Sequence, residues 1–600
     1  MKRFLAALLL ALPLAAADLV IPPVEEVLPP LIPWSGKSES LIAASNDPWI
    51  TPSEKSGLTT TPDYDATVAW LRKLVSASQQ LKMVSIGTSP EGREIWMVIA
   101  SKEGSSTPEG LRRNGRPTVL AHSGIHSGEI DGKDAGMMLL RDITVRGLEK
   151  RLLDRANFLF IPILSVDAHE RASRYSRINQ RGPEVSGWRN NARNMNLNRD
   201  YAKADTVEIR SLIAAIRRWD PDLYLDLHVT DGADYQYDIT YGFNSGAWSP
   251  AIGEWLTSTL SPKFDYDLAA WGHIPGPLIF NVADDFSKGI SGWISPPRFS
   301  TGYGDAIHLP TVLVENHSLK PYRQRVLGTY ILLRSALESV GDSAQSLRAA
   351  IDADMKRRAE SIPLSWRVPE SGPEKIEIQS IRSRQRLSEI TGSMVTDWLG
   401  EPETITVDYH VASEVATSVT RPKAWWVPPA WPEVIDRLDA HGIRYERITA
   451  PRDVEVEMYR LVDPKIETSP MEGHARVTSG LQPERRTWRF PTNSLRVPAD
   501  QALGTLAAIL LEPASTDSFF QWGFMLEVLS RTEYVESYVM EPMARRMLEA
   551  NPALRAEFEE KLRTDVAFRG NPNARLQWFY EKTPWLDERW KLYPIGRETE

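Results

Sequence analysis

Apolar strand-like segments alternate with amphipathic helical segments through the first half of the chain, and this alternation most constrains the fold. Phe158 to Leu164 is a continuous apolar run, FLFIPIL, and shorter strand-like runs cover Leu223–Leu227 and Thr311–Val314. The spacing of apolar residues predicts helices over Val207–Trp219 and Gln324–Val340. Strands without polar alternation are typical of a sheet that is covered on both faces. We therefore expect an α/β domain with a largely buried sheet.

The chain has 600 residues, too many for one hydrophobic core, so we expect several domains. Within the later part we predict helices over Trp431–Ala440, closed by Gly442, and over Gly523–Thr532. The predicted segments are a signal peptide over 1–17, a Pro-rich arm over 18–55, an α/β domain over 56–345, a linker over 346–375, a β-rich domain over 376–500 and a helix-rich region over 501–600.

The first residues have the composition of a secretory signal peptide. Lys2 and Arg3 form a positive start, Phe4 to Leu14 is a short apolar run, and Ala15 to Ala17 supply the small residues at a cleavage site. The apolar run is too short to span a bilayer, which disfavours the alternative of an uncleaved anchor. We therefore expect a secreted or periplasmic protein that has no membrane attachment after cleavage near Ala17.

The charge and the cysteine count exclude several classes of function. A net charge of −9 over this length argues against a nucleic-acid partner, because nucleic-acid binders carry a basic surface. The sequence contains no cysteine, so disulfides, thiolate metal ligands and a catalytic cysteine are impossible. Any transition metal must be held by histidine and carboxylate side chains.

The segment LAHSGIHSGEIDGKDA combines the two ligand types that remain. His126 and Glu129 have an HxxE spacing in a loop that follows a predicted strand, and His228 ends another strand in LYLDLHVTDG. A catalytic zinc site needs three such ligands and an open position. The ends of strands are also where open α/β sheets place their sites. An isolated HxxE is a weak signal, so the assignment of a metal site depends on the other motifs in the chain.

Further motifs follow the HxxE in a fixed order. Asp167 stands in ILSVDA, then come GWRNNARNMNLNRDY, His228 and LPTVLVENHS. Over Tyr64 to Glu338 this arrangement resembles the zinc carboxypeptidase family, peptidase family M14. The resemblance implies a catalytic domain over 56–345 with a mixed β-sheet flanked by helices, and the residue patterns after it indicate a β-rich and helical extension.

The resemblance also implies a metal site and a general base. It makes His126, Glu129 and His228 the ligands of one zinc ion. It makes Glu315, in LVEN, the base that takes a proton from the zinc-activated water and later passes it to the leaving amine. The alternative for Glu315 is a structural salt bridge, because an unpaired carboxylate in an apolar strand is costly.

Three further residues receive roles in binding the reacting peptide. Arg189 would stabilise the developing oxyanion, and Asn198 and Arg199 would grip the C-terminal carboxylate of the substrate, the arginine as a two-pronged donor. The alternatives are that Arg189 is a surface residue beside Trp188 and that Arg199 pairs with Asp200.

The sequence departs from the family pattern at several positions. Asn196 stands where the family has an aspartate that orients a ligand histidine, which removes a charge from the metal site. The family's NPDG turn is reduced to SVDA, and only Asp167 remains. Tyr303 is our candidate for the family's mobile substrate-binding tyrosine. Arg177 is a second candidate for an arginine in the active site.

The function that we predict is hydrolysis of the C-terminal peptide bond of a peptide with a free C-terminus. One alternative keeps the same zinc site but acts as an amidase on peptidoglycan stem peptides or acylated amino acids. Another alternative is a non-catalytic peptide-binding protein on a peptidase scaffold. The complete set of ligands together with Glu315 disfavours this last alternative.

Overall fold

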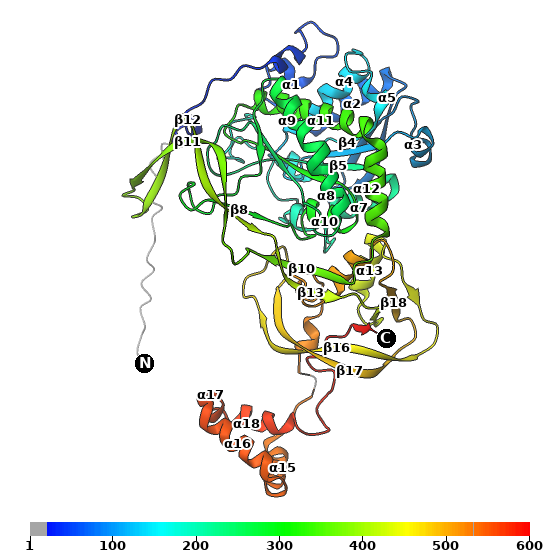
Figure 1. The fold of residues 1–600 in the computed structure, drawn as a ribbon, viewed down its shortest axis with the longest axis vertical. Coiled ribbons are helices and arrows are strands. Elements are labelled where there is room, and N and C mark those ends of the chain that lie inside the picture. The colour runs from blue at the N-terminus through cyan, green and yellow to red at the C-terminus, as the bar shows by residue number, and fades with distance from the viewer. Residues whose placement is uncertain (1–20, 532, 600) are drawn as a thin grey trace, which may run out of the picture.

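The structure, a computed structural model, describes residues 21–531 and 533–599. The predicted signal peptide over 1–17 lies outside these residues. Within the described ranges, no helix combines the length and the apolar character needed to cross a membrane. Figure 1 shows a large α/β body, a β-rich part below it and a small helical lobe at the far end.

The α/β body is built around one eight-stranded mixed sheet. The four central strands run parallel to one another, and the strand on each side of these four runs antiparallel to its central neighbour. Across the sheet the strands are β1 (Leu81–Thr88), β2 (Glu94–Ala100), β4 (Asn157–Ile161), β3 (Thr118–Ser123), β5 (Leu223–Val229), β9 (Thr311–Asn316), β6 (Ile239–Gly242) and β7 (Pro275–Pro277). The predicted fold class, a mixed sheet with flanking helices, is confirmed.

The central strands are apolar throughout because both faces of the sheet are covered. β3, β4 and β5 are buried along their whole length. α4 (Asp131–Ile143) packs against β3 and β5, and α11 (Tyr322–Asp342) packs against α4. Gly136 in α4 permits this approach, because a Cβ there would overlap the ring of Phe160.

Side-chain caps fix the first residues of two further helices of the body. α7 (Val207–Trp219) begins after Thr206, whose side chain accepts the backbone N–H of Ile209, and it packs beside β1. α2 (Tyr64–Ala77) begins in the same way after Asp63. The remaining helices of the body are α1 (Pro52–Lys55), α3 (Pro108–Asn114), α5 (Leu152–Arg155), α6 (Val166–Glu170), α8 (Pro250–Trp255), α9 (Ser261–Ala270), α10 (Ser300–Ala306) and α12 (Ala344–Lys356).

Two smaller sheets connect the body to the rest of the chain. β11 (Glu374–Leu387) and β12 (Met394–Ala412) form a long antiparallel hairpin, and β12 also pairs in parallel with β8 (Ile290–Trp293). β10 (Ser361–Arg367) pairs with β13 (Glu414–Thr420). The end of the long hairpin extends away from the body in Figure 1.

A six-stranded sheet forms the β-rich part. In order it contains β15 (Glu446–Arg447), β18 (Leu495–Pro498), β14 (Ala424–Val427), β19 (Gly596–Glu598), β16 (Arg452–Ile466) and β17 (Val477–Phe490). Beside it lie α13 (Pro432–His441), which ends at Gly442 with φ of 77°, and the fully buried α14 (Gly504–Leu511). Gly442 thus closes the predicted helix as a left-handed cap.

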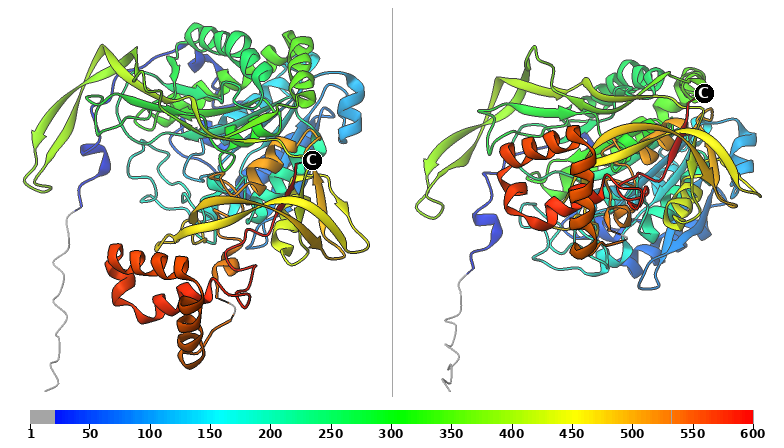
Figure 2. Two further views of the ribbon diagram at one scale, coloured as in Figure 1. Left: turned by 60° about the horizontal axis from the view of Figure 1, so that its bottom comes forward. Right: turned by 90° about the horizontal axis from the view of Figure 1, so that it is seen from below.

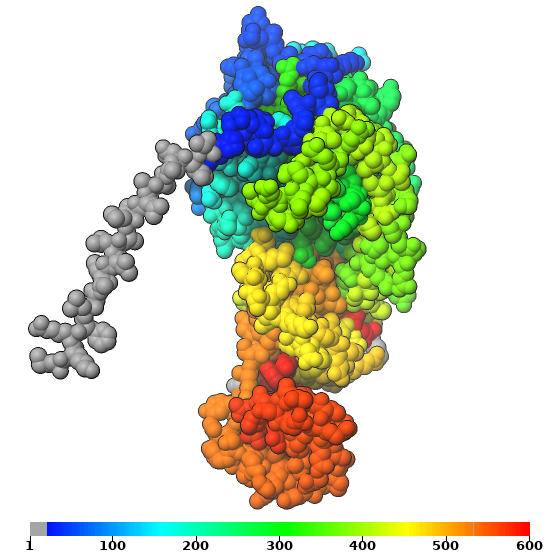
Figure 3. Space-filling view, turned by 90° about the vertical axis from the view of Figure 1, so that its left-hand side faces the viewer, coloured from blue at the N-terminus to red at the C-terminus, as the bar shows by residue number. Residues whose placement is uncertain are grey.

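Four short helices form a lobe with a small core of its own. They are α15 (Ser537–Ala550), α16 (Pro552–Thr564), α17 (Val566–Gly570) and α18 (Pro572–Tyr580). Met540, Phe579 and Tyr580 are buried inside this lobe. Figures 2 and 3 show the lobe standing off the rest of the molecule. The chain then returns to add β19 to the six-stranded sheet.

Two sequence-based expectations differ from the structure. Residues 346–375, predicted as a linker from their prolines, instead contain most of α12 and all of β10. Asp354 of α12 accepts the backbone N–H of Ile252 at 2.8 Å, so this segment is packed onto the body. The predicted helix over Gly523–Thr532 is reduced to one 3-10 turn, Leu526–Leu529. The outer boundaries that we propose for the domains stay predictions.

Candidate active site

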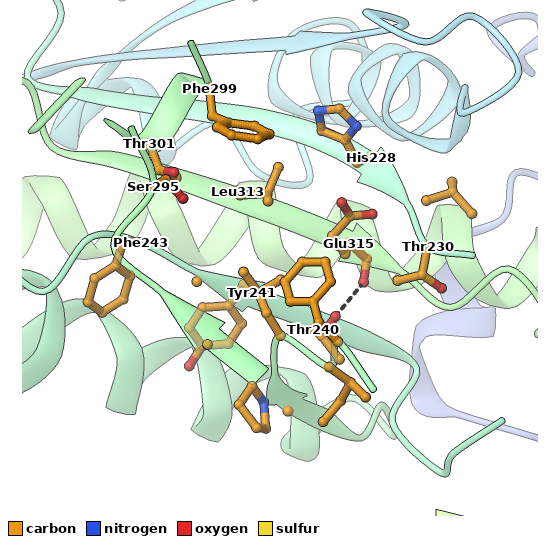
Figure 4. A pocket seen from close by; sticks show the side chains of 18 of the residues that line it. His228, Thr230, Thr240, Tyr241, Phe243, Ser295, Phe299, Thr301, Leu313 and Glu315 are labelled. Carbon is orange, nitrogen blue, oxygen red and sulfur yellow. Dashed lines mark hydrogen bonds between the residues drawn. The ribbon is translucent and has the colours of Figure 1, made fainter. Parts of the chain in front are cut away.

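The candidate site residues gather where the parallel strands β3, β5 and β9 end. His126 and Glu129 lie in the loop that follows β3, and His228 and Glu315 are register partners on β5 and β9. The carboxyl ends of parallel strands meet at one edge of a sheet, which is where open α/β sheets form their sites. Figure 4 shows His228 and Glu315 beside each other on these neighbouring strands.

The loop after β3 is a compact turn that places both HxxE side chains together. Gly124 has φ of 67°, a left-handed conformation that glycine adopts without strain, and the chain changes direction there. The backbone N–H of Glu129 then donates to the carbonyl of His126 at 2.9 Å. The spacing of the motif therefore corresponds to one turn, with both side chains facing the same point.

His126, Glu129 and His228 are buried and present one atom each to a common centre. These three atoms all lie within 4.8 Å of one another. Nδ1 of His126 lies 3.2 Å from Oε1 of Glu129, and Nδ1 of His228 lies 2.9 Å from Oε2 of the same carboxylate. Both histidines thus turn Nδ1 toward the centre.

The other nitrogen of each histidine contacts an oxygen acceptor outside the centre. Nε2 of His126 lies 2.8 Å from Oδ1 of Asn196, the residue that replaces the family aspartate. Nε2 of His228 lies 2.9 Å from Oδ1 of Asp226, which also contacts His122 at 3.1 Å. Contacts of this kind fix the orientation and the tautomer of a metal-binding histidine.

Asp226 was missed by the sequence analysis, although the sequence contained a signal for it. In LYLDLHV, Asp226 and His228 are two residues apart on one strand, so both side chains point to the same face of the sheet. Strand periodicity alone therefore predicts that the carboxylate of Asp226 lies beside the imidazole of His228.

Two carboxylates at the centre have pKa values below their usual range. Burial acts to raise the pKa of Glu129, but His126 and Arg177 outweigh it and hold the pKa well below its usual range. Burial also acts to raise the pKa of Asp226, yet the facing His228 brings the pKa down to about 2. Two buried carboxylates therefore stay ionised in a small volume.

Glu315 lies beside this centre without a salt bridge. None of the ion pairs in the described chain involves Glu315, and its Oε2 is buried without a hydrogen-bond partner among the described residues. Burial, opposed by the charge of His228, raises the pKa of the carboxyl to about 8. Among the described residues, Glu315 therefore does not form the structural salt bridge that was its alternative role.

Arg177 and Arg189 both reach the centre. Nη1 of each guanidinium lies 3.0 Å from Oε1 of Glu129. Arg177 is nearly buried, with 9% of its side chain exposed, whereas 40% of Arg189 is exposed. Arg189 is thus at the opening of the site and not a surface residue remote from it.

Asn198 and Arg199 lie on the 3-10 turn Leu197–Arg199 that follows Asn196. The guanidinium of Arg199 donates to the carbonyl of Asn198 at 2.8 Å and stacks on the ring of Phe299 at 4.4 Å. Asp200 does not pair with it, because that carboxylate accepts from Lys203 and Thr206. Within the described residues, Arg199 forms no ion pair, so its charge is available to a ligand.

These residues share one cavity of about 930 Å³. The predicted ligands, Glu315, Arg189, Asn198 and Arg199 all line it. Other lining residues come from β6, β7 and the segment before α10, and Gln379 and Tyr409 belong to the long hairpin. A cavity of this size accommodates more than one amino-acid residue.

Tyr303 does not take part in this cavity, and its predicted role is wrong. The residue lies on α10 with 2% of its surface exposed, and its hydroxyl contacts Nδ1 of His441 at 3.0 Å. Its ring packs against Tyr201. The hydroxyl is therefore engaged in the contact between α10 and α13 and cannot reach a ligand.

The donor set fits a zinc ion. Atoms that share one tetrahedral zinc at about 2.1 Å are roughly 3.4 Å apart, close to the 3.2 Å and 2.9 Å separations at the centre. Nδ1 of His126 is buried and makes no hydrogen bond with any described residue.

Comparison with known proteins supports this assignment. Residues 67–248 match the family model of zinc carboxypeptidases. Carboxypeptidase 2 of Trichophyton tonsurans is 22% identical over 508 residues, which cover 80% of this chain and 87% of that protein. Carboxypeptidase 2 of Trichophyton rubrum is 22% identical over 493 residues, which cover 78% and 85%.

Solved structures with a partial likeness include two bacterial enzymes. A metallo-carboxypeptidase from Burkholderia cenocepacia aligns with a TM-score of 0.35 and 16% identity over 46% of this chain and 69% of that one. A metallo-carboxypeptidase from Pseudomonas aeruginosa, in complex with (2-guanidinoethylmercapto)succinic acid, aligns with a TM-score of 0.35 and 15% identity over 48% and 70%. The match to the family model includes all three candidate ligands, and this zinc carboxypeptidase domain over residues 67–248 indicates a zinc metallopeptidase.

Proposed function

We propose that the chain is a carboxypeptidase that removes residues from the free C-terminus of a peptide, with Glu315 as the general base. The observation that carries the proposal is one cavity that joins three elements. These are the His126–Glu129–His228 centre, the buried carboxyl of Glu315, and the guanidinium of Arg199, which forms no ion pair with any described residue. A peptide that spans the cavity would present its last peptide bond to the centre and its carboxylate to Arg199.

We propose His126, Glu129 and His228 as the ligands of one zinc ion. Zinc bound there supplies a Lewis acid that polarises a carbonyl and lowers the pKa of water. The protein holds the two histidines through Asn196 and Asp226, so both rings are oriented before any ligand arrives.

Glu315 moves the proton. Its carboxylate accepts a proton from the attacking water, and the carboxyl then donates that proton to the nitrogen of the leaving residue. Burial raises the pKa of Glu315 to about 8, which keeps both protonation states accessible near neutral pH. A group with a pKa near the working pH is the most effective acid–base catalyst.

Two groups select and stabilise the substrate. Arg199, with Asn198 beside it, binds the terminal carboxylate through two parallel charge-assisted hydrogen bonds. Arg189, at the opening of the centre, donates to the oxygen on which negative charge develops. We also propose a secreted or periplasmic location, which rests on the signal peptide predicted over residues 1–17.

A panel of peptides tests this function. Matched peptides with free and amidated C-termini, and peptidoglycan-derived stem peptides, are incubated with the zinc-loaded protein, and the products are identified by mass. We expect one residue at a time to leave the free C-termini, at a rate well above that of the amides. Equal internal cleavage of amidated peptides would contradict a carboxypeptidase, and exclusive cleavage of stem peptides would indicate an amidase.

A further inference from the structure

The hairpin β16–β17 of the six-stranded sheet ends in a tight turn that contacts the candidate active site. Met471 and His474 exchange two backbone hydrogen bonds of 2.9 Å and 3.0 Å, which leaves Glu472 and Gly473 as a two-residue turn. We call residues 471–474 the hairpin tip. Figure 3 shows the β-rich part of the chain directly against the α/β body.

Glu472 has an unusual backbone conformation in this turn. Its φ is 48° and that of Gly473 is 81°, as two-residue hairpin turns of this type require. Asparagine, aspartate and glycine are the residues that normally occupy the first position, and a long side chain with positive φ is uncommon. Turn geometry therefore does not explain a glutamate here, and its side-chain contact does.

The carboxylate of Glu472 contacts the backbone of the substrate-binding turn. Its Oε2 accepts the N–H of Asn196 at 2.7 Å, across 276 residues of sequence. The side chain of Asn196 in turn contacts Nε2 of His126 at 2.8 Å and accepts the backbone N–H of Asn198 at 3.0 Å. One hydrogen bond from the hairpin tip thus fixes the residue that orients both a metal-binding histidine and the turn carrying Arg199.

A second contact from the hairpin tip holds the far end of the same segment. Nε2 of His474 lies 2.7 Å from Oδ2 of Asp205, and Arg437 of α13 lies 2.7 Å from the other oxygen of that carboxylate. The ring of His474 also stacks on Phe524 at 4.9 Å. Residues 196–205 are therefore anchored at both ends by side chains from the region after residue 430.

We propose that the hairpin tip is part of the active site, with Glu472 as a positioning residue that sets the orientation of Asn196 and, through it, of His126 and the Asn198–Arg199 turn. The proposal rests on the proposed carboxypeptidase function for the part that concerns substrate. The β-rich region then has a defined role, because the α/β body alone does not contain the acceptor for the Asn196 N–H.

Three variants of the full-length protein test the role of Glu472. Glu472→Ala removes the acceptor, Glu472→Gln keeps an oxygen acceptor without the charge, and Glu467→Ala is the control. Glu467 is an exposed carboxylate of the same hairpin just before the tip. The readouts are the zinc dissociation constant from competition with a chelator, kcat and KM for matched free and amidated peptides, and the melting temperature.

Glu472→Ala is expected to weaken zinc binding roughly tenfold, the lower end for groups that orient a metal-bound histidine. It should also raise KM for the free peptide about tenfold, with a smaller change for the amide, because the Arg199 turn is loosened. Glu472→Gln should recover most of both effects, and Glu467→Ala should behave as the parent.

Two results would overturn the proposal. A lower melting temperature with unchanged zinc affinity and unchanged KM would make Glu472 merely structural, and a glutamine variant as impaired as the alanine variant would exclude the hydrogen bond as the cause. The zinc measurement needs no substrate, so it stands even if the parent protein does not prefer free C-termini, a result that would remove only the proposed function.

Discussion

Replacing Arg199 with alanine should abolish the preference for a free C-terminus. The guanidinium is half-buried, stacks on Phe299 and, in the described chain, has no carboxylate partner, so a substrate carboxylate is its natural counter-ion. A hydrogen bond to a charged group contributes about 2 kcal/mol, and an amide in the same place offers only a neutral acceptor. At 1.4 kcal/mol per factor of ten, 2 kcal/mol corresponds to roughly thirtyfold in kcat/KM.

The assay is the ratio of kcat/KM for a free peptide to that for its amide. We expect a ratio of roughly thirty or more for the parent and a ratio near one for Arg199→Ala, with zinc content unchanged. Arg199→Lys, which keeps the charge without the planar fork, should fall between them. Arg193→Ala is the matched control, because Arg193 is an exposed arginine on the same segment. A parent-like ratio in Arg199→Ala would refute the assignment of the carboxylate site.

Three further substitutions test other parts of the site. Glu315→Gln should lower turnover by about a hundredfold or more while zinc stays bound, and loss of zinc on metal analysis would make Glu315 a ligand instead. Asp226→Asn removes the charge that faces His228, and it should weaken zinc binding by about tenfold in a chelator competition; an unchanged affinity would contradict the supporting role. Asp205→Asn should reduce the loss of folding stability that the parent protein shows as the pH falls into the acid range. Although burial opposes it, His474 and neighbouring cations lower the pKa of Asp205 from its usual 3.8, so the stabilisation is present above that pH and is lost as the pH falls below it. Melting curves between pH 7 and about 3 that match the parent would exclude this contribution.

Local patterns predicted the α/β body well. α7 has the bounds that the spacing of its apolar residues predicted. It is an amphipathic segment, and the side chain of Thr206 caps its first turn. β1 was missed because its alternation of polar and apolar residues is weak, and every residue after Leu81 is exposed or half-exposed.

The predictions that failed depended on packing between distant segments. Prolines indicated a linker at 346–375. In the structure, Asp354 of α12 accepts the backbone N–H of Ile252 in α8, a contact between residues that are 102 positions apart in the sequence. Tyr303 was our candidate for a substrate-binding tyrosine, yet its hydroxyl contacts His441, 138 residues later in the chain.

The candidate site was predicted only where a sequence motif or the end of a strand fixes a residue's position. The HxxE turn and the two strand ends fix the positions of His126, Glu129, His228 and Glu315 from local sequence and strand order. The contact between Glu472 and Asn196 spans 276 residues and carries no local motif, so sequence reasoning had no means of finding it.

Zinc occupancy and hydrolysis, measured on the same sample, test the proposed mechanism most directly. The protein is stripped with a chelator, zinc is returned in steps, and bound metal and the release of a C-terminal residue are followed together. We expect one zinc ion per chain, no hydrolysis in the stripped protein, and activity that rises in proportion to occupancy. Full activity in a metal-free preparation would contradict a zinc peptidase, whatever the geometry of the three ligands.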